Sequence, residues 1–409
     1  MGVANRGKSV IRRRGSSRPR LRGLSSSPGA ARRGSPERRT RMKRKRKAVR
    51  RSSSRISRKL ARSNRAALPA SKAAALFDGI RREGEAVGAA WRTATPNGGL
   101  QELKKHIQQA WTARSAGVGE QLQKLGWQQI WGQGEAFGQG AMTGAGYSAG
   151  FAPLPLRGSA AAVLYADPDS EASLHTVLSE LDRLPLAETI VVAGEVSEKW
   201  LTQARSHASA SIVCYPEEVD ADVGRALGAK LTGADIVLFV DARRPVPAER
   251  LARYLWASDG GLDVVLSDVS DRGTFHRRAP IARLREFLNV TLNRPDLRMN
   301  AIGPLPFALS RNALDTIGPA DLAIPAKAHA VAVIRGLSIG TAWRTEGERG
   351  LDGDSAYADL PLALGDHFEA WRAATTLRGN RLRFEDRLRA RRAVGGVVSD
   401  EILDHYTDE

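Results

Sequence analysis

The chain has 409 residues, of which 42% are hydrophobic and 26% charged, so most of it can bury the core of one large domain or two ordinary ones. The net charge of +19 is concentrated at one end. Residues 1–65 carry 25 Lys and Arg against one acidic residue, whereas the other 344 residues carry 38 basic and 43 acidic side chains. Because the positive charge lies outside the part that can fold, the composition argues against a compact nucleic-acid-binding fold with a basic face.

The single cysteine, Cys214, excludes a disulfide framework and a cysteine-rich metal site. It stands in an apolar stretch and is predicted to be a core residue. No apolar run reaches the roughly 18 residues that a membrane-spanning helix needs, and the basic N-terminus lacks the apolar segment of a secretory signal. These features predict a cytoplasmic protein without a transmembrane segment, either free or peripheral at the inner membrane surface.

Residues 1–65 consist mainly of Arg, Lys, Ser, Gly and Pro, which predicts a disordered basic tail because little apolar surface can be buried. Three interpretations stay open. The tail could bind an anionic polymer, nucleic acid or a membrane surface by counterion release, or it could be solvated with no specific partner. In the third, Met42 is the start of translation and residues 1–41 are not made.

Residues 66–158 are predicted to form a helical, glycine-rich connector. Apolar residues recur at helical spacing before and after a Pro-Asn-Gly-Gly turn at 96–99. Six glycines follow between residues 134 and 150, and the pairs four apart would let another backbone approach closely. Trp127 and Trp131 share a helix face and are predicted to pack in a core or against a partner.

An alternative for this connector is a hairpin embedded in lipid, because residues 136–156 carry no charge. Glycine is a poor helix former and the segment is only weakly apolar. A helical or partly disordered connector outside the membrane is therefore favoured.

Five short apolar runs rich in Val and Ile follow, with helical stretches between them. This alternation predicts an α/β fold, with an open, mostly parallel twisted sheet and helices on both faces. Ligands of such sheets bind beyond the carboxyl ends of the strands. The predicted strands are 160–166, 188–194, 210–216, 234–242 and 262–268, and the predicted helices are 171–184, 196–208, 222–232 and 247–257.

Taken in order, these segments resemble the nucleotide-sugar-binding half of a family 2 glycosyltransferase with the GT-A fold. Later segments resemble the acceptor-side half of a bacterial branch with basic, glycine-rich N-termini, and the resemblance covers roughly residues 160–375. The sequences that carry it are VLYADPDSEASLHTVLSEL, ETIVVAGEVSE, DVGRALGAKLTGADIVLFVDARRPVPAERLARYL, LNVTLNRPDLRMNAIGPLPFALSRNALDTIG and LALGDHFEAW.

The resemblance implies transfer of a sugar, with inversion, from a UDP- or GDP-linked donor to a hydroxyl acceptor. It also implies a nucleotide-sugar-binding half at 159–270 and an acceptor-side half at 271–395. Residues 396–409 are predicted to form a C-terminal tail.

Family members usually hold a divalent cation, Mn or Mg, with an Asp-x-Asp element. Asp241 matches the first carboxylate of that element, but Arg243 stands where the last one belongs. An arginine cannot ligate a cation, although with Arg244 it could itself neutralise a diphosphate. Two interpretations follow: a metal-independent transferase, or a catalytically inactive binding or assembly protein that its basic tail tethers to an anionic surface.

Three further residues are implied to contact the nucleotide sugar, and the first two have a structural alternative. Arg225 would face the diphosphate, or would pair with Asp222 three residues earlier. Asp167 would contact the nucleoside, or would form a turn beside Pro168. Glu195 would reach the base, in place of the acidic residue that the family carries directly after its second strand.

On the acceptor side, Asp366 or His367 is predicted to be the general base, and His367 could also ligate a cation together with Asp241. Asp268, after the fifth strand, is a second candidate. The alternative for Asp366 is a capping box with Glu369 that begins a helix. Ser310, with the residue that follows it, would shape the acceptor pocket or mark a strand entering a helix.

Overall fold

The computed structural model of the chain describes residues 70–116, 125–194, 196–207, 209–215, 220–270, 275–342 and 360–384. The predicted basic tail, the predicted C-terminal tail and Glu195 lie outside these residues.

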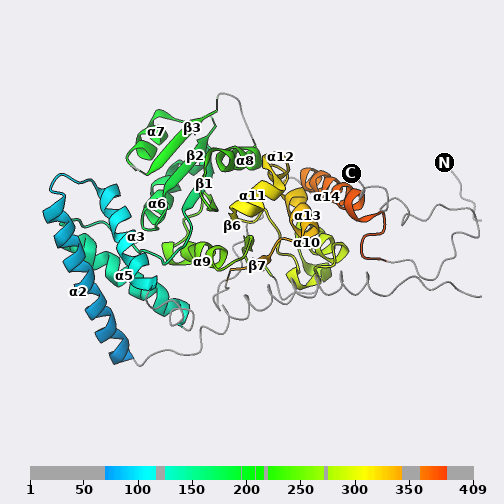
Figure 1. Ribbon diagram of the computed structural model, residues 1–409. Helices are drawn as coiled ribbons and strands as arrows, with labels where there is room; N and C mark the ends of the chain where they lie inside the picture. The colour runs from blue at the N-terminus through cyan, green and yellow to red at the C-terminus, as the bar shows by residue number, and fades with distance from the viewer. Residues whose placement is uncertain are drawn as a thin grey trace, which may run out of the picture. The chain divides into compact units, whose positions relative to one another are not determined.

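A seven-stranded sheet forms the centre of the described part (Figure 1). Its strands run in the order β3-β2-β1-β4-β6-β5-β7, and β6 is antiparallel to both of its neighbours, whereas the other pairings are parallel. The predicted mostly parallel α/β sheet is confirmed, and the five predicted runs form its first five strands. The strands are β1 (Ala160–Ala166), β2 (Glu188–Ala193), β3 (Ala210–Cys214), β4 (Ile236–Asp241), β5 (Val264–Leu266), β6 (Phe307–Ser310) and β7 (Ile339–Thr341).

Both faces of the sheet are buried, because successive apolar side chains of a strand point to opposite sides. The four predicted helices are confirmed as α6 (Glu171–Asp182), α7 (Glu198–Arg205), α8 (Ala221–Leu231) and α9 (Ala248–Asp259). Later helices are α10 (Pro280–Thr291), α11 (Arg311–Ile317), α12 (Pro319–Leu322), α13 (Pro325–Arg335) and α14 (Leu360–Arg378), and short 3-10 turns lie at η2 (Pro168–Ser170), η3 (Phe275–Arg277) and η4 (Pro295–Leu297). On β1, Leu164 belongs to one hydrophobic core together with α6, α7 and α9, whereas Val163 belongs to a second core together with α8 and α13.

One detail of the sheet differs from the sequence prediction, and a second was not predicted. Cys214 is exposed, so its prediction as a core residue is wrong, because β3 is an edge strand with one neighbour. The fourth and fifth predicted strands are not neighbours, because β6 comes from much later in the chain and pairs between them. Strand pairing over such a separation leaves no local signal in the sequence.

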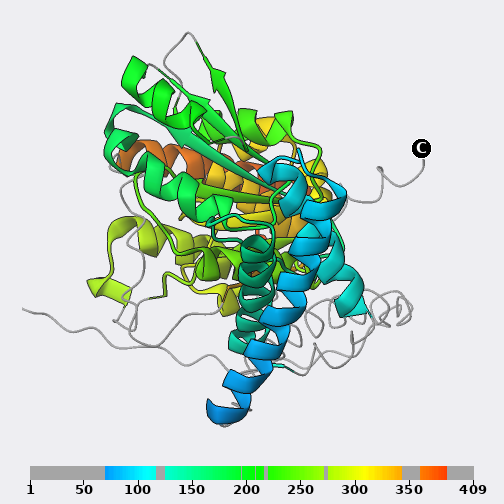
Figure 2. The same ribbon diagram turned by 90° about the vertical axis from the view of Figure 1, so that its left-hand side faces the viewer.

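Among the described residues, three helices precede the sheet: α2 (Ala70–Ala94), α3 (Leu100–Ala116) and α5 (Trp127–Gly144). Helices α2 and α5 run side by side in both views (Figures 1 and 2). A Cβ added to Gly84 of α2 would lie 2.2 Å from the Phe137 carbonyl oxygen, and one added to Gly140 of α5 would lie 2.0 Å from that of Arg81. The predicted close approach of another backbone to the glycine pairs is therefore confirmed. None of the helices in the described ranges is both long and apolar enough to cross a membrane.

Helices α2, α3 and α5, which we call the helical layer, are joined to the α/β part through contacts that are buried or partly buried. The rings of Trp127 and Trp131 stack 6.3 Å apart inside the core on one face of the sheet, which confirms their predicted packing role. The Trp127 indole N–H donates to Glu249 of α9 at 3.1 Å. On α3, the Gln108 side-chain amide exchanges two hydrogen bonds with the backbone of Leu154, just before β1.

Candidate functional site

Two predicted carboxylates meet at the carboxyl ends of neighbouring strands. Asp241 is the last residue of β4 and is in register with Tyr165 of β1, so Asp167, two residues further along, lies at the same edge. We call this edge, with Asp167, Asp241, Arg243 and Arg244, the rim. Parallel strands bring their carboxyl ends together, and the structure therefore assembles residues that are 74 positions apart in sequence.

Arg243 lies between the two carboxylates. Its Nη1 is 3.7 Å from Asp167 Oδ2, and its Nε is 3.6 Å from Asp241 Oδ1. The same Asp241 oxygen accepts the Arg243 backbone N–H at 2.9 Å, which fixes the turn that follows β4. Arg244 Nε approaches the other Asp241 oxygen at 3.9 Å, so this cluster of two acids and two bases is balanced in charge.

These rim contacts are loose. Distances of 3.6–3.9 Å exceed those of a direct hydrogen bond, and the Arg243 side chain is 35% exposed. Ion pairs of this kind contribute about 0–1 kcal/mol to stability. The buried Asp167 Oδ1 has no hydrogen-bond partner among the described residues. Arg243 therefore lies near the solvent, and its guanidinium is too far from Asp167 and Asp241 for a direct hydrogen bond with either.

The rim residues do not fit a divalent cation. Both Asp241 oxygens have an arginine nitrogen within 4 Å, and a positive metal ion would have to displace those charges. No group of three or more His, Cys, Asp or Glu side chains with metal-binding geometry occurs in the described ranges. No hydrogen bond or ion pair joins His367 to Asp241, and the geometry therefore does not support the predicted role of His367 as a shared ligand.

Arg225 pairs with Asp222, as the structural alternative in the sequence analysis predicted. It lies on α8 with its side chain 8% exposed and forms an ion pair with Asp222. Burial raises the pKa of Asp222, while the charge of Arg225 opposes that rise. In a buried pair of this kind the two side chains point toward each other. The role of Arg225 as a diphosphate ligand stays a prediction.

The candidate acceptor residues lie in different parts of the fold. Because β5 is parallel to β4, Asp268 lies at the same edge as Asp241, where its Oδ1 accepts from Ser270 N–H at 3.0 Å and Asn300 Nδ2 at 3.2 Å. Ser310 lies at the opposite edge, because it pairs with Ile236 at the start of β4, and its hydroxyl caps α11. A strand entering a helix is therefore the correct interpretation of that segment.

Asp366 and His367 lie within α14, which begins at Leu360. The predicted helix start at Asp366 is wrong, because the apolar residues before it extend the helix by six positions. His367 is 3% exposed, its Nδ1–H donates to the Ala363 carbonyl at 2.7 Å, and burial lowers its pKa. A neutral imidazole facing the interior is poorly placed to take a proton from a substrate.

A second buried histidine was not foreseen. The side-chain amide of Asn289 donates to two backbone carbonyls, so its oxygen must accept from His329 Nε2–H at 2.7 Å. His329 is fully buried, and burial is the main reason that its pKa falls to about 3. The isolated position of His329 in an alanine-rich helix gave no sequence signal of this role.

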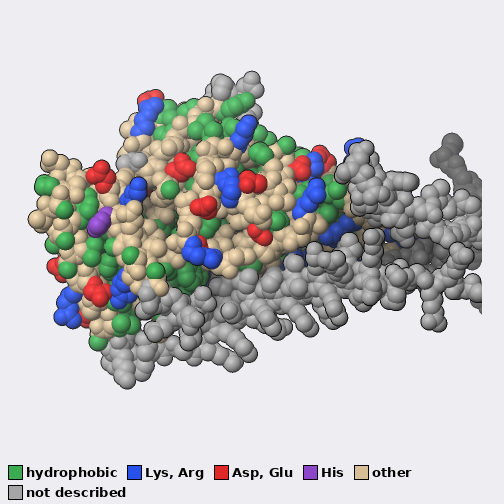
Figure 3. Space-filling model, in the orientation of Figure 1, with side chains coloured by type: hydrophobic (Ala, Val, Ile, Leu, Met, Phe, Trp, Pro, Cys, Tyr) green, Lys and Arg blue, Asp and Glu red, His purple; other side chains and the backbone are tan. Residues whose placement is uncertain are grey.

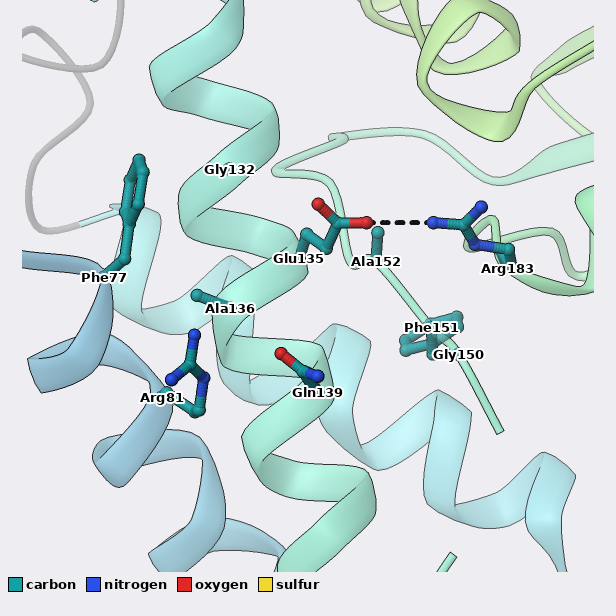
Figure 4. Close-up of a pocket in the computed structure, with 10 residues that line it drawn as sticks. All are labelled: Phe77, Arg81, Gly132, Glu135, Ala136, Gln139, Gly150, Phe151, Ala152 and Arg183. Atoms are coloured by element: carbon teal, nitrogen blue, oxygen red, sulfur yellow. Dashed lines mark hydrogen bonds and ion pairs between the residues drawn. The ribbon is translucent and has the colours of Figure 1, made fainter. Parts of the chain in front are cut away.

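A pocket of about 440 Å³ lies in the helical layer, away from the rim (Figure 4). Phe77 and Arg81 of α2 line it together with Glu135 and Gln139 of α5. Glu135 points toward Arg183 and pairs with it at 2.9 Å. Its charged groups of both signs define no ligand class. On the face shown in Figure 3, acidic and basic side chains of the described residues are interspersed, as the charge balance of residues 66–409 predicts.

No protein-family model and no curated protein matches the sequence significantly. Part of the chain is similar to solved structures. Glucosyl-3-phosphoglycerate synthase from Mycobacterium tuberculosis in complex with UDP is 21% identical, with 52% of this chain and 81% of that chain covered and a TM-score of 0.37. The same synthase with Mn²⁺, UDP-glucose and phosphoglyceric acid has 21% identity, coverages of 52% and 80%, and a TM-score of 0.37. A mycobacterial protein has 17% identity, coverages of 56% and 76%, and a TM-score of 0.38. TM-scores of this size establish neither a fold nor an activity for this chain.

Proposed function

We propose that the rim binds the diphosphate of a UDP- or GDP-linked sugar, and that the protein transfers the sugar to a hydroxyl acceptor without a metal ion. The observation that carries the proposal is the Arg243 guanidinium, which lies 3.6–3.7 Å from two carboxylates at the carboxyl ends of adjacent parallel strands. The ordered resemblance to family 2 glycosyltransferases supports the choice of ligand. The bound Mn or Mg that such a resemblance implies is left out of the proposal, because the rim does not fit one.

The chemistry needs positive charge where the leaving group develops negative charge. A guanidinium offers a fork of N–H donors that matches two phosphate oxygens, whereas Asp167 and Asp241 would hold it from the other side. Arg244 would add a second charge. Since these cations belong to the chain, the site is preorganised before the donor binds.

The acceptor hydroxyl must lose its proton as it attacks the anomeric carbon. Asp268 is the carboxylate that the topology places on the same edge as Asp241, with β6 between their strands. At about 4.8 Å per strand, the two strand ends are roughly 10 Å apart, which leaves room for a sugar ring. We therefore propose Asp268 as the base, ahead of Asp366 and the buried His367.

The test is calorimetric titration of the full chain with UDP- and GDP-sugars, in EDTA and again with Mn²⁺. We expect saturable binding in EDTA that weakens at least tenfold in Arg243→Ala. Arg205→Ala is the matched control, because Arg205 pairs with Glu198 at 3.6 Å on the surface of α7, and it should bind as the unmodified chain does. Binding that requires Mn²⁺, or that survives Arg243→Ala, would contradict the proposal.

Failure of every nucleotide sugar to bind would favour the second function, a non-catalytic binding or assembly protein. The specific observation in its favour is that the rim charges already neutralise one another. In that case the basic segment 1–65 would carry the activity, as a tether to an anionic polymer, nucleic acid or membrane surface. Its binding would be salt-sensitive and lost on deletion of those residues, and Asp241→Ala would have no effect.

A further inference from the structure

A pair of histidines lies outside the rim, where α6 meets the end of α7. His175 is on α6 and exposed, and His207 follows α7 and is 8% exposed. His175 Nδ1 and His207 Nε2 are 3.1 Å apart, and the two rings are tilted by 53°. Nothing in the proposed transfer reaction uses them.

Asp182 fixes the orientation of His207. Its Oδ2 accepts the His207 Nδ1–H at 2.6 Å, so that Nε2 keeps its lone pair. Asp182 is itself held by Ser209 Oγ at 2.5 Å on the other oxygen, and by Lys104, whose ammonium donates to the Asp182 backbone carbonyl at 2.8 Å. A carboxylate bonded to the far nitrogen of an imidazole is the usual outer partner of a metal-ligating histidine.

The separation of the two nitrogens also suits a shared metal ion. With a zinc–nitrogen bond of about 2.05 Å and a tetrahedral angle, two ligating nitrogens lie about 3.3 Å apart. Replacing the hydrogen bond by a metal therefore needs a movement of a few tenths of an ångström. The proton on His175 Nδ1 would move to its Nε2, so that the ring stays neutral and no proton is lost.

We propose that His175 Nδ1 and His207 Nε2 bind a divalent transition-metal ion of the zinc, nickel or copper type, with Asp182 orienting His207. Because the described ranges contain no three-ligand group, water completes the coordination shell from the exposed side of His175. Imidazole pairs select these ions over Mg²⁺ and Ca²⁺, which prefer oxygen ligands. The site would clamp α6 to the end of α7.

The experiment is Zn²⁺ titration of the full chain in chelator-free buffer without nucleotide, by calorimetry. His175→Ala removes one ligand from an exposed position, and we expect the zinc dissociation constant to rise at least tenfold. Asp182→Asn should weaken binding about tenfold or more through the lost orientation of His207. His106→Ala, which removes a histidine of α3 outside the pair, is the matched control and should leave zinc binding unchanged.

Copper-loaded protein provides a readout independent of stability. The electron paramagnetic resonance spectrum of the Cu²⁺ form should show coupling to two nitrogens in the unmodified chain and to one in His175→Ala. Equal zinc affinity in His175→Ala and the unmodified chain, or a copper spectrum with fewer than two nitrogens, would overturn the proposal. Either result leaves the proposed sugar transfer untouched, because no rim residue is involved.

Discussion

The helical layer and the rim hold their residues in opposite ways. Between α2 and α5, a Cβ added to Gly88 would lie 1.9 Å from the Ala141 carbonyl oxygen, and one added to Gly144 would lie 2.1 Å from that of Glu85. At the rim, Arg243 keeps 3.6–3.7 Å from its two carboxylates and stays partly exposed. At these glycine contacts there is no room for an added side-chain atom, whereas Arg243 at the rim is able to exchange its partners.

The two arrangements have different consequences for stability and for binding. Close backbone packing at glycine stabilises the fold because it excludes water and side chains, and added atoms at these positions cause steric clashes. Loose ion pairs contribute little to folding, but they place charge where a ligand can use it. Substitutions in the helical layer should therefore change the free energy of unfolding, and substitutions at the rim should change binding.

The largest effect is expected from the double substitution Gly84→Ala and Gly88→Ala. Each methyl group would collide with a backbone carbonyl that cannot move aside by rotating a side chain. We expect the free energy of unfolding to fall by about 3 kcal/mol or more, measured by denaturant titration. Gly79→Ala on the same helix is the control, because its Cβ would meet nothing within 4 Å. The free energy of unfolding of this control should rise by about 0.5–1 kcal/mol. An equal loss of stability in both variants would contradict the role of backbone contacts at Gly84 and Gly88.

A smaller effect is expected from acid, through the interior of the α/β part. His329 stays neutral in the fold down to its pKa of about 3, whereas in the unfolded chain it takes up a proton near pH 6.5. Between those values the unfolded state binds more protons, so stability falls as pH falls, by about 1 kcal/mol per pH unit below 6. Above pH 6.5 this histidine contributes no pH dependence.

The substitution His329→Gln distinguishes the pH dependence due to His329 from that due to other titratable groups. Glutamine can still donate to Asn289 but does not titrate. The variant should lose stability at pH 7 through altered packing, yet its stability should fall less steeply between pH 6.5 and 5 in denaturant titrations. His367, which is also buried with a lowered pKa, would supply the remaining slope. An unchanged slope in the variant would show that His329 is not the group responsible.

The smallest effect on stability is expected at the rim, from Arg243→Asp. This substitution replaces the tethered cation by a third carboxylate, beside Asp167 and Asp241. The free energy of unfolding should fall by about 1 kcal/mol or less, because the lost ion pairs are weak and the repulsion among the three carboxylates is screened at this partly exposed site. Nucleotide-sugar binding should be lost in EDTA and restored by Mn²⁺. Binding in EDTA as strong as that of the unmodified chain would contradict the role of Arg243.

Local patterns in the sequence predicted much of the fold. The five Val- and Ile-rich runs and the helices between them were predicted from periodicity, because the spacing of apolar residues within a strand or helix shows which of its faces is buried. The glycines of α5 also indicated close packing. Periodicity could not predict the position of β6, the exposure of Cys214 or the true start of α14, because pairing partners and edge positions depend on residues far away in the chain.

The sequence by itself determined the first five strands with the helices between them, the near balance of charge in residues 66–409 and the presence of Asp167, Asp241 and Arg243 at the ends of their strands. These features depend on neighbouring residues. The tertiary structure alone decided that Arg243 lies between two carboxylates, that Arg225 turns to Asp222 and that His367 is buried. It also brought together the histidines at 175 and 207. Contacts across the sheet and between helices are chosen by the packing of the whole core, and no short stretch of sequence contains that information.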